Sequence, residues 1–234
     1  KYFFIRYQDE GGHHIRIRYH NSLQNGFWKE IIARLQERIQ PAIENHSVHN
    51  VQFETYQREV ERYGFDTMEL SENIFHYQSL FVLNFISLLD GDEGEQYRWQ
   101  IALKAVDMIL DDFQYTLPQK RDLVESLNKN FADEFKVGAP EQKKISERFS
   151  GSKKIIQYVM NEGQEEDENL KSGIGAFVLE DSNYRNTIEK ILNTASVHHD
   201  RQQVNRLMSS YLHMFVNRMF VSNQRKVELV VYDY

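Results

Sequence analysis

The stretch FFIRYQDEGGHHIRIRYH, residues 3–20, decides the fold at the start of the chain. Apolar and polar residues alternate at period two before and after Glu10-Gly11-Gly12, and glycine-containing turns of this kind connect antiparallel strands. Residues 2–9 and 13–20 are therefore predicted to form a β-hairpin. This hairpin is rich in arginine, although the chain as a whole has a net charge of −7.

The second strand has two unlike faces, because successive side chains of a strand point to opposite sides. One face carries His14, Arg16, Arg18 and His20, and the other carries His13, Ile15, Ile17 and Tyr19. The isoleucine face is expected to join the hydrophobic core. For the basic face a solvated surface strand is the ordinary interpretation, so the arginines alone do not establish a site.

The rest of the chain is predicted to be mostly helical. Apolar residues recur at helical spacing in segments 27–45, 68–90, 96–114, 119–136, 141–161, 184–196 and 202–221. Residues 48–57 are predicted as a third strand, and the tail KVELVVYDY, residues 226–234, as another strand. The acidic segment 161–173 is expected to be a mobile surface loop.

These elements indicate one α+β domain over residues 1–234. A small antiparallel sheet lies near the N-terminus and is followed by a mostly helical part. The chain opens inside a strand pattern, at Lys1-Tyr2-Phe3. We therefore expect that part of the N-terminal side of the domain precedes this sequence.

Composition narrows the function. Lys and Arg number 28 against 35 Asp and Glu, so we do not expect the domain to bind nucleic acid, whose phosphates require basic residues. The absence of cysteine excludes disulfides, thiolate metal sites and cysteine nucleophiles, and it is compatible with a reducing cytoplasm. The most apolar run, LFVLNFISLL at 80–89, is too short to span a bilayer.

The nine histidines raise the question of a metal site. They include the pairs His13-His14 and His198-His199, and His46 with His49. None shows the i, i+4 helical spacing with a nearby carboxylate that a zinc site uses, and adjacent histidines on a strand point apart. We therefore expect no metal and no cofactor.

Further arginines follow the segment predicted as a third strand. TYQREVERYG, residues 55–64, carries Arg58 and Arg62 together with Glu59 and Glu61. If this segment lies beside the hairpin, several guanidinium groups meet over one sheet, and they need an anionic partner. The partner could be one of these glutamates, or a substrate carboxylate, which the planar guanidinium fork matches well.

The stretch SSYLHMFVNRMF, residues 209–220, is strongly apolar and helical in pattern. It contains His213 and, one turn further on, Asn217. From spacing alone, a core histidine bonded to a carbonyl and a functional histidine are about equally supported. The functional alternative is a general acid or base in a dry pocket.

Taken together, these stretches resemble the C-terminal domain of lantibiotic dehydratases, the glutamate-elimination or thiopeptide-type bacteriocin biosynthesis domain. The matching motifs are YFFIRYQD with HHIRIRYH, ETYQREVERYG with MELSENIFHYQS, and SSYLHMFVNRMF, in the family's order. In such dehydratases a Ser or Thr of a ribosomally made precursor peptide is glutamylated from glutamyl-tRNA, and this domain then eliminates glutamate. The resemblance implies a lyase that leaves dehydroalanine or dehydrobutyrine. The large glutamylating domain is not in this sequence, so the chain is expected to be either one protein of a split enzyme, with a separate glutamylating subunit, or a fragment of a longer protein. The family domain usually begins a few dozen residues earlier than Lys1.

The resemblance also assigns roles residue by residue. The catalytic positions match His213, Arg16 and Arg62. The substrate-binding positions match Arg18 and Glu59, and Arg6 is added because its strand face also carries Tyr2 and Phe4. A buried neutral histidine can remove the α-proton, while the arginines hold the glutamyl carboxylate and the developing enolate charge.

Two positions depart from the family pattern. Phe65 stands where a second glycine is usual, and Gln78 stands where an acidic residue is common. Neither removes a matched catalytic residue type, but both put the pocket shape and the substrate preference in question.

Two other functions remain open. One is a thiopeptide pyridine synthase, which resembles this family and joins two dehydroalanines by a formal cycloaddition. The other is a non-catalytic subunit that only binds the precursor peptide, for which His213 would be dispensable. Retention of all five matched residue types favours elimination. The oligomeric state is also open and could be a homodimer.

Overall fold

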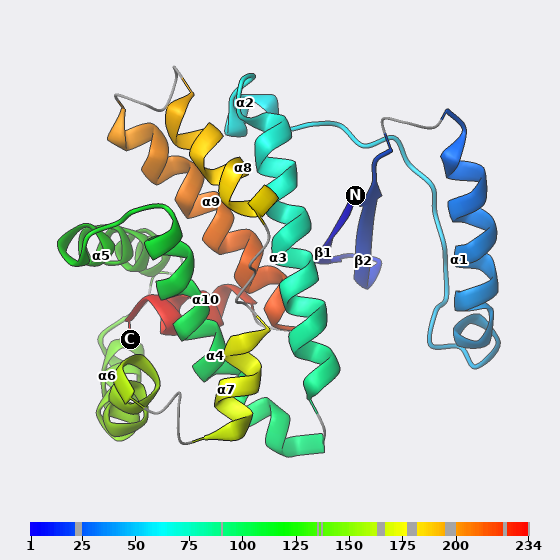
Figure 1. The fold of residues 1–234 in the computed structure, drawn as a ribbon. Helices are drawn as coiled ribbons and strands as arrows, with labels where there is room; N and C mark the ends of the chain where they lie inside the picture. Colours follow the sequence, from blue (N-terminus) through cyan, green and yellow to red (C-terminus); the bar gives the residue numbers. More distant parts are fainter. Residues whose placement is uncertain are drawn as a thin grey trace.

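The computed structural model describes residues 1–21, 25–89, 91–134, 136, 138–162, 167–176, 182–194, 200–221 and 224–233. Within these ranges a two-stranded antiparallel sheet, β1 (Tyr2–Asp9) and β2 (Gly12–Tyr19), is followed by helices (Figure 1). The helices are α1 (Phe27–Glu44), α2 (Val60–Tyr63), α3 (Met68–Leu88), α4 (Gly91–Asp112), α5 (Leu117–Glu134), α6 (Ala139–Gln157), the π-helix η1 (Tyr158–Glu162), α7 (Glu168–Gly175), α8 (Ser182–Asn193), α9 (Arg201–Met219) and α10 (Gln224–Asp233). The predicted fold class is confirmed.

The hairpin has the predicted glycine turn. Asp9 pairs with Gly12 across a two-residue loop, and the Asp9 carboxylate accepts a hydrogen bond from the Gly11 N–H at 2.9 Å. Gly12 has a φ of 95°, a conformation in which any side chain would be strained. The register places Phe3 opposite Arg18 and Ile5 opposite Arg16, so these four residues share one face of the ribbon.

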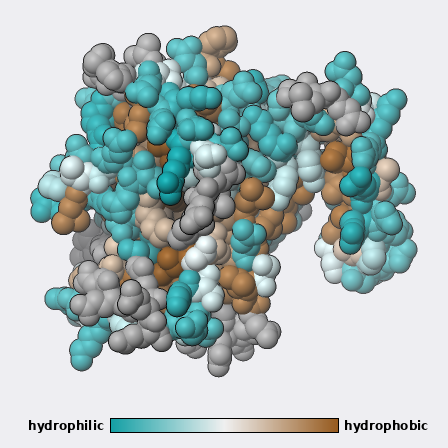
Figure 2. All heavy atoms as spheres, in the orientation of Figure 1, coloured by the Kyte–Doolittle hydropathy of each residue, from teal (hydrophilic) through white to brown (hydrophobic). Residues whose placement is uncertain are grey.

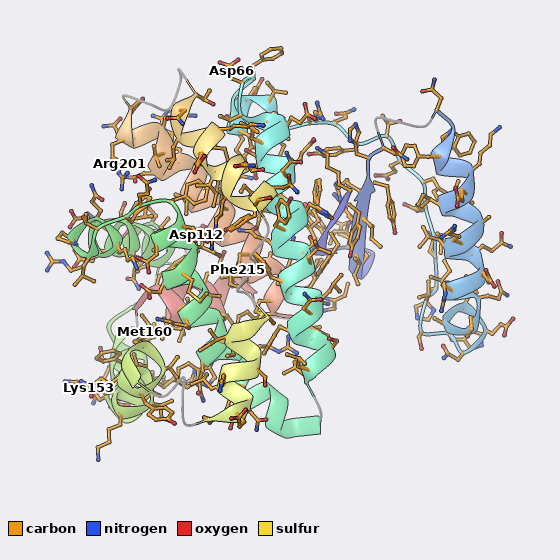
Figure 3. All side chains as sticks on the ribbon, in the orientation of Figure 1. Asp66, Asp112, Lys153, Met160, Arg201 and Phe215 are labelled. Carbon is orange, nitrogen blue, oxygen red and sulfur yellow. The ribbon has the colours of Figure 1, made fainter. Side chains whose placement is uncertain are left out.

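The core of the helical body is built around α9. Its residues Leu207, Tyr211, Phe215 and Met219 are each at most 1% exposed, and their spacing of four residues makes one continuous apolar stripe. Figure 3 shows Phe215 at the centre of the body, whereas Asp66 and Lys153 lie at its periphery. α3 and α4 supply the facing residues, which include Phe75, Phe85, Ile101 and Ile109.

All seven predicted helices are present, with end shifts of up to five residues. α1 is the unusual one, because none of its residues is buried. It lies on the far side of the hairpin from the helical body (Figure 1). Pro41 lies inside α1, and the helix continues past it to Glu44.

The predicted third strand is wrong. Residues 48–59 have no regular secondary structure and run beside α1 instead of pairing with the hairpin (Figure 1). Side chains of α3 and α9 occupy the outer edge of β1, so the segment cannot pair there, and it contacts the hairpin through the ring of Tyr56 on Phe3. This segment therefore contributes Tyr56 to the core margin without joining the sheet.

The predicted C-terminal strand is also wrong, because residues 224–233 form α10. The β-branched composition of KVELVVYDY suggested a strand, but Glu228, Val231 and Tyr232 are buried at helical spacing. Packing against α5 and α9 therefore overrides local propensity.

Part of the predicted acidic loop is a helix. α7 begins at Asp167, whose carboxylate caps the helix by accepting bonds from the N–H groups of Asn169 and Leu170. Leu170 is fully buried, and a Cβ on Gly173 would lie only 2.8 Å from the Ile101 side chain. Apolar packing on α4 fixes this segment despite its acidic composition. Residues 163–166 lie outside the described residues.

The isoleucine face of β2 does not join the core, contrary to prediction. Ile15 is 56% exposed and Ile17 is 45% exposed. The hairpin docks on the helical body through the outer edge of β1 and not through a face of the sheet. Both faces of β2 therefore remain partly accessible to solvent.

Candidate active site

The outer edge of β1 is bound by helix side chains that replace a neighbouring strand. His76 Nδ1 lies 2.6 Å from the Tyr2 carbonyl, and the Ser79 hydroxyl accepts a bond from the Phe4 N–H. Asn217 accepts from the Arg6 N–H at 2.9 Å and donates to the Arg6 carbonyl at 2.7 Å. An exposed strand edge would be a site of unwanted pairing, so these contacts both position the hairpin and protect its edge.

Arg218 is the central residue of this docking. Its guanidinium donates to the carbonyls of Phe4 (2.6 Å) and Met214 (2.8 Å) and to the Gln78 side chain (3.0 Å). It also lies over the Phe75 ring at 5.2 Å. Complete burial lowers the pKa of Arg218 to about 9, which leaves it cationic at neutral pH. A buried cation held by carbonyls therefore joins β1, α3 and α9.

Arg16 and Arg18 lie on the same face of β2, as predicted. Arg16 Nε donates to His14 at 3.1 Å, and its guanidinium lies 3.9 Å from the centre of the Tyr7 ring. Arg18 lies over the Tyr56 ring at 5.2 Å. Burial lowers the pKa of Arg18, and the neighbouring Arg16 acts in the same direction. The two guanidiniums therefore form a strip of positive charge that disfavours further cations and favours an anion.

Glu59 and Arg62 lie near this strip, at the N-cap and in the last turn of α2. Arg62 forms an ion pair with Glu59 at 3.2 Å, and both side chains are more than half exposed. Glu59 in turn acts on Arg18, whose pKa it raises against the larger effect of burial. Glu59 is therefore paired with Arg62 and also interacts electrostatically with Arg18.

A pocket of about 380 Å³ opens beside Arg18, and Arg62 does not line it. Arg58 is one of the residues that line this pocket, and it makes a bidentate ion pair with the buried Glu72 at 2.8 and 2.7 Å. The remaining lining includes Arg18 and Tyr56. Arg58 was noted in the sequence only as one more cation. Its carboxylate partner lies fourteen residues away, and no spacing rule connects the two.

Arg6 has a structural partner. Its Nε donates to the Arg218 carbonyl at 3.0 Å, and burial lowers the pKa of Arg6. Arg6 lies on the face opposite Arg16 and Arg18, because it pairs with Ile15 in the ladder. Arg6 therefore lies on the other face of the hairpin from Arg16 and Arg18, and a substrate bound on their face would not reach it there.

His213 pairs with a glutamate that the sequence did not reveal. Nδ1 of His213 lies 2.6 Å from Oε1 of Glu228 on α10, and the Glu228 side chain is fully buried. Since an ionised carboxylate only accepts hydrogen bonds, it holds the proton on Nδ1 and leaves Nε2 as the basic nitrogen. The His213 side chain is 26% exposed, so solutes can approach it. Among the described residues no hydrogen bond or ion pair links His213 to Arg16, Arg18 or Arg62.

α9 nevertheless places His213 near the hairpin. Asn217, which holds β1 at Arg6, lies one helical turn after His213, a rise of about 6 Å along the axis. Contacts of Lys1 with Asn73 and of Phe4 with Ser79 show that β1 and α3 run in the same direction. Contacts of Ser71 with Tyr211 and of Gln78 with Arg218 show the same for α3 and α9, so β1 and α9 also run in the same direction (Figure 1). His213 is therefore displaced from Asn217 away from the β1–β2 turn.

Two further properties were tested by the structure. Within the described ranges, no three His, Asp or Glu side chains gather in a way that could hold a metal ion. His198 and His199 lie outside these ranges. Over the same residues, every helix is too short or too polar to cross a bilayer.

The fold and the site define a class of protein, an α+β domain whose arginine-bearing hairpin is docked on a helical body beside a His–Glu pair. The chain belongs to the family described as lantibiotic biosynthesis dehydratase C-term, which matches residues 1–234. The resemblance expected from the three motifs is thereby confirmed. A search of curated proteins found no significant match.

A solved structure shares the fold. It is the tRNA-dependent lantibiotic dehydratase MibB from Microbispora sp. 107891, with a TM-score of 0.63 and 17% sequence identity. The similarity covers 99% of this chain but only 24% of MibB. The chain therefore corresponds to about a quarter of that protein.

Proposed function

We propose that this domain eliminates glutamate from glutamylated Ser or Thr residues of a ribosomally made precursor peptide, and so acts as a lyase in peptide dehydration. Membership of the dehydratase family supports a role in dehydration. The observation that carries the proposal is that one helix, α9, bears His213, which is paired with Glu228 of α10, and also holds the arginine hairpin through Asn217 and Arg218.

The reaction needs a base more than a strong acid. Glutamate that comes from glutamyl-tRNA is esterified through its α-carboxyl group and leaves as that carboxylate, whose acid has a pKa of about 3.5, so departure requires little help. Removal of the α-proton of an amide is the difficult step. His213 Nε2 is suited to take this proton, because Glu228 holds the other ring nitrogen in the donor state. Glu228 is thus a positioning residue.

The arginines supply the charge that the reaction requires. The strip of Arg16 and Arg18, extended by Arg62, can bind the glutamyl carboxylate and stabilise negative charge on the enolate oxygen. Glu59 keeps Arg62 in place until an anion binds. A separate glutamylating subunit or domain would supply the glutamylated peptide.

Mass spectrometry tests the proposal. A synthetic peptide with an O-glutamyl-serine is incubated with the protein, and loss of one glutamic acid per site with formation of dehydroalanine is expected. His213→Ala should leave the glutamyl ester in place while retaining the melting temperature of the parent. Regeneration of the unmodified serine residue in the peptide, which would indicate ester hydrolysis, or an unchanged peptide with a correctly folded protein, would contradict the proposal.

A further inference from the structure

Arg16 is held by a histidine of its own strand. The Nε–H of Arg16 donates to Nε2 of His14 at 3.1 Å. A guanidinium only donates hydrogen bonds and stays protonated, so Nε2 of His14 must carry a lone pair. His14 is therefore neutral in this contact and has its proton on Nδ1. This tautomer is the less common one in free histidine, which mostly carries its proton on Nε2.

The turn of the hairpin supplies acceptors for the Nδ1–H group of His14. The Gly12 carbonyl lies 3.2 Å from Nδ1, which is a hydrogen-bond distance. The Asp9 carboxylate lies 3.8 Å from both Nδ1 and the Arg16 guanidinium, too far for a hydrogen bond but close enough for attraction. The Gly11 N–H holds this carboxylate in place at 2.9 Å. The turn therefore favours the same tautomer that Arg16 requires.

Tyr7 packs against both side chains. Its ring centre lies 5.3 Å from that of His14 and 3.9 Å from the guanidinium carbon of Arg16. The register explains this grouping, because Tyr7 lies opposite His14 and Asp9 lies opposite Gly12 on the same face of the ribbon. All of these residues belong to the hairpin. The hairpin alone therefore determines how the Arg16 side chain is held.

The bond to His14 leaves the other end of the guanidinium for a ligand. It uses the Nε–H of Arg16, whereas the two Nη groups form the end of the planar fork that binds carboxylates. The Arg16 side chain is 37% exposed. Figure 2 shows hydrophilic and hydrophobic residues side by side on the surface between α3 and α1, where the hairpin lies. Because Arg16 is already ordered by His14 and Tyr7, a ligand loses less side-chain entropy when it binds there.

We propose that His14 is a positioning residue, which in its neutral form holds Arg16 ready for the free carboxylate of the glutamyl group. The α-carboxyl of this glutamate is esterified, so its side-chain carboxylate is the group that a guanidinium can bind. His14 does not touch the substrate and acts only through Arg16. This proposal rests on the proposed function and adds to it a residue that orients one of the predicted catalytic arginines.

Protonation of His14 disrupts this arrangement. A charged imidazole carries a proton on both nitrogens, so Nε2 no longer accepts from Arg16 and two cations face each other. Among the described residues, the charged or titratable side chains in contact with His14 are Tyr7 and Asp9 of β1 and Arg16 of β2, and Arg18 lies further along the same face. Asp9 attracts the Nδ1–H of either form, so the bond that is lost is the one to Arg16. Binding of the glutamyl carboxylate is therefore expected to weaken when His14 becomes charged.

Nuclear magnetic resonance tests the tautomer without any substrate. The protein is labelled with ¹⁵N, and the His14 ring signals are those that disappear in His14→Gln. At about pH 8 the ring should be neutral with its proton on Nδ1, and the Arg16 Nε–H signal should shift when the ring is protonated at lower pH. A neutral ring with its proton on Nε2 would exclude the bond from Arg16 and would refute the proposal.

Two matched variants separate the acceptor from the ring. His14→Gln places an amide oxygen near the position of Nε2, whereas His14→Phe keeps an aromatic ring beside Tyr7 and accepts no hydrogen bond. The probe is a short peptide with a central Nβ-glutamyl-diaminopropionate, whose amide link replaces the ester and resists elimination. At about pH 8, His14→Phe should bind it about tenfold more weakly than the parent, and His14→Gln within about threefold of the parent. Equal loss in both variants, or loss in neither, would overturn the role of the acceptor.

The pH dependence of probe affinity needs only the parent and His14→Gln, so it remains decisive if His14→Phe does not fold. From about pH 8 to about pH 5 the parent should lose about fivefold more affinity than His14→Gln, whose amide cannot be protonated. His213 is present in both proteins, so its titration affects both alike. Parallel profiles combined with elimination from the ester peptide refute only this inference. Divergent profiles without elimination refute only the proposed function.

Discussion

Asn217 pairs with the backbone of Arg6 as a neighbouring strand would, through one accepted and one donated hydrogen bond of 2.9 and 2.7 Å. Asn217→Ala should therefore leave two partly buried backbone groups unsatisfied and destabilise the protein by about 2–3 kcal/mol. The melting temperature should fall by about 4–10 °C. Asn73→Ala is the control, because Asn73 accepts only from the exposed Lys1 ammonium. A fall no larger than that of the control would show that Asn217 does not hold β1.

Arg218 should be irreplaceable by lysine. An ammonium cannot reach Phe4, Met214 and Gln78 together, whereas the planar guanidinium does. Arg218→Lys should lower the free energy of unfolding by about 3 kcal/mol or more, measured by urea denaturation. Arg201→Lys, which alters only a contact with the Tyr115 ring and a surface bond to Gln119, should change it by less than about 1 kcal/mol. Similar values for the two variants would refute the central role of Arg218.

The His213–Glu228 pair predicts a graded loss of activity. His213→Ala should reduce the elimination rate by about 10²–10⁴-fold, the usual effect of losing a general base. Glu228→Gln keeps a hydrogen-bond acceptor but removes its charge, so the rate should fall less and its dependence on pH should shift. Single-turnover rates at several pH values, with melting temperatures of both variants, measure this. A Glu228→Gln enzyme with the parent's rate and pH profile would exclude Glu228 as a positioning residue.

Variants at Arg58 and Arg62 should distinguish a loss of folding stability from a loss of peptide binding. Arg58→Ala leaves the buried Glu72 carboxylate without its two-pronged partner and should cost about 1–3 kcal/mol of stability. Arg62→Ala disrupts an exposed pair with Glu59 and a 6.0 Å contact with the Tyr63 ring, and should cost at most about 1 kcal/mol. Arg62→Ala should nevertheless weaken binding of a glutamylated peptide. Unfolding curves and peptide titrations on both variants test this, and the reverse order of stabilities would contradict the structure.

Buried tyrosines predict unfolding at alkaline pH. Burial raises the pKa of Tyr115 to about 12 and also raises that of Tyr63, Tyr184 and Tyr211. The unfolded value is about 10, so the folded state holds these protons more tightly. Their stabilising effect is complete below pH 10 and is lost as the pH rises toward 12. Phenolate absorbance should therefore appear together with loss of circular dichroism. Full ionisation before unfolding would contradict this.

The sequence was informative wherever a local rule applies. The hairpin follows from alternation around a glycine turn, and α9 follows from an apolar stripe at helical spacing. The same rules fail where tertiary packing decides. α10 looks like a strand because of its valines, yet Glu228, Val231 and Tyr232 meet the body on one helical face. The partner of His213 lay in that misassigned segment, so sequence reasoning could not find it.

The site residues were predicted individually, but not their arrangement. Arg16 and Arg18 share a face because strands alternate, which requires only local geometry. The docking of β1 depends instead on residues in two distant helices, and no periodicity reports such contacts. Arg218 appeared in the sequence as an ordinary residue after Asn217, although it is fully buried and joins three elements. The sequence signal that could have revealed this role was a basic residue inside the apolar stretch 209–220.

The docking of β1 also has a consequence for biosynthesis. Arg6 and Asn217 are 211 residues apart in the chain, so the hairpin emerges from the ribosome long before its docking surface exists. At usual translation rates this delay is about 10–40 s. During that time the backbone of β1 at Arg6 is unpaired, since α9 has not yet been made. The nascent chain would therefore benefit from a chaperone that covers the hairpin until synthesis of α9 is complete.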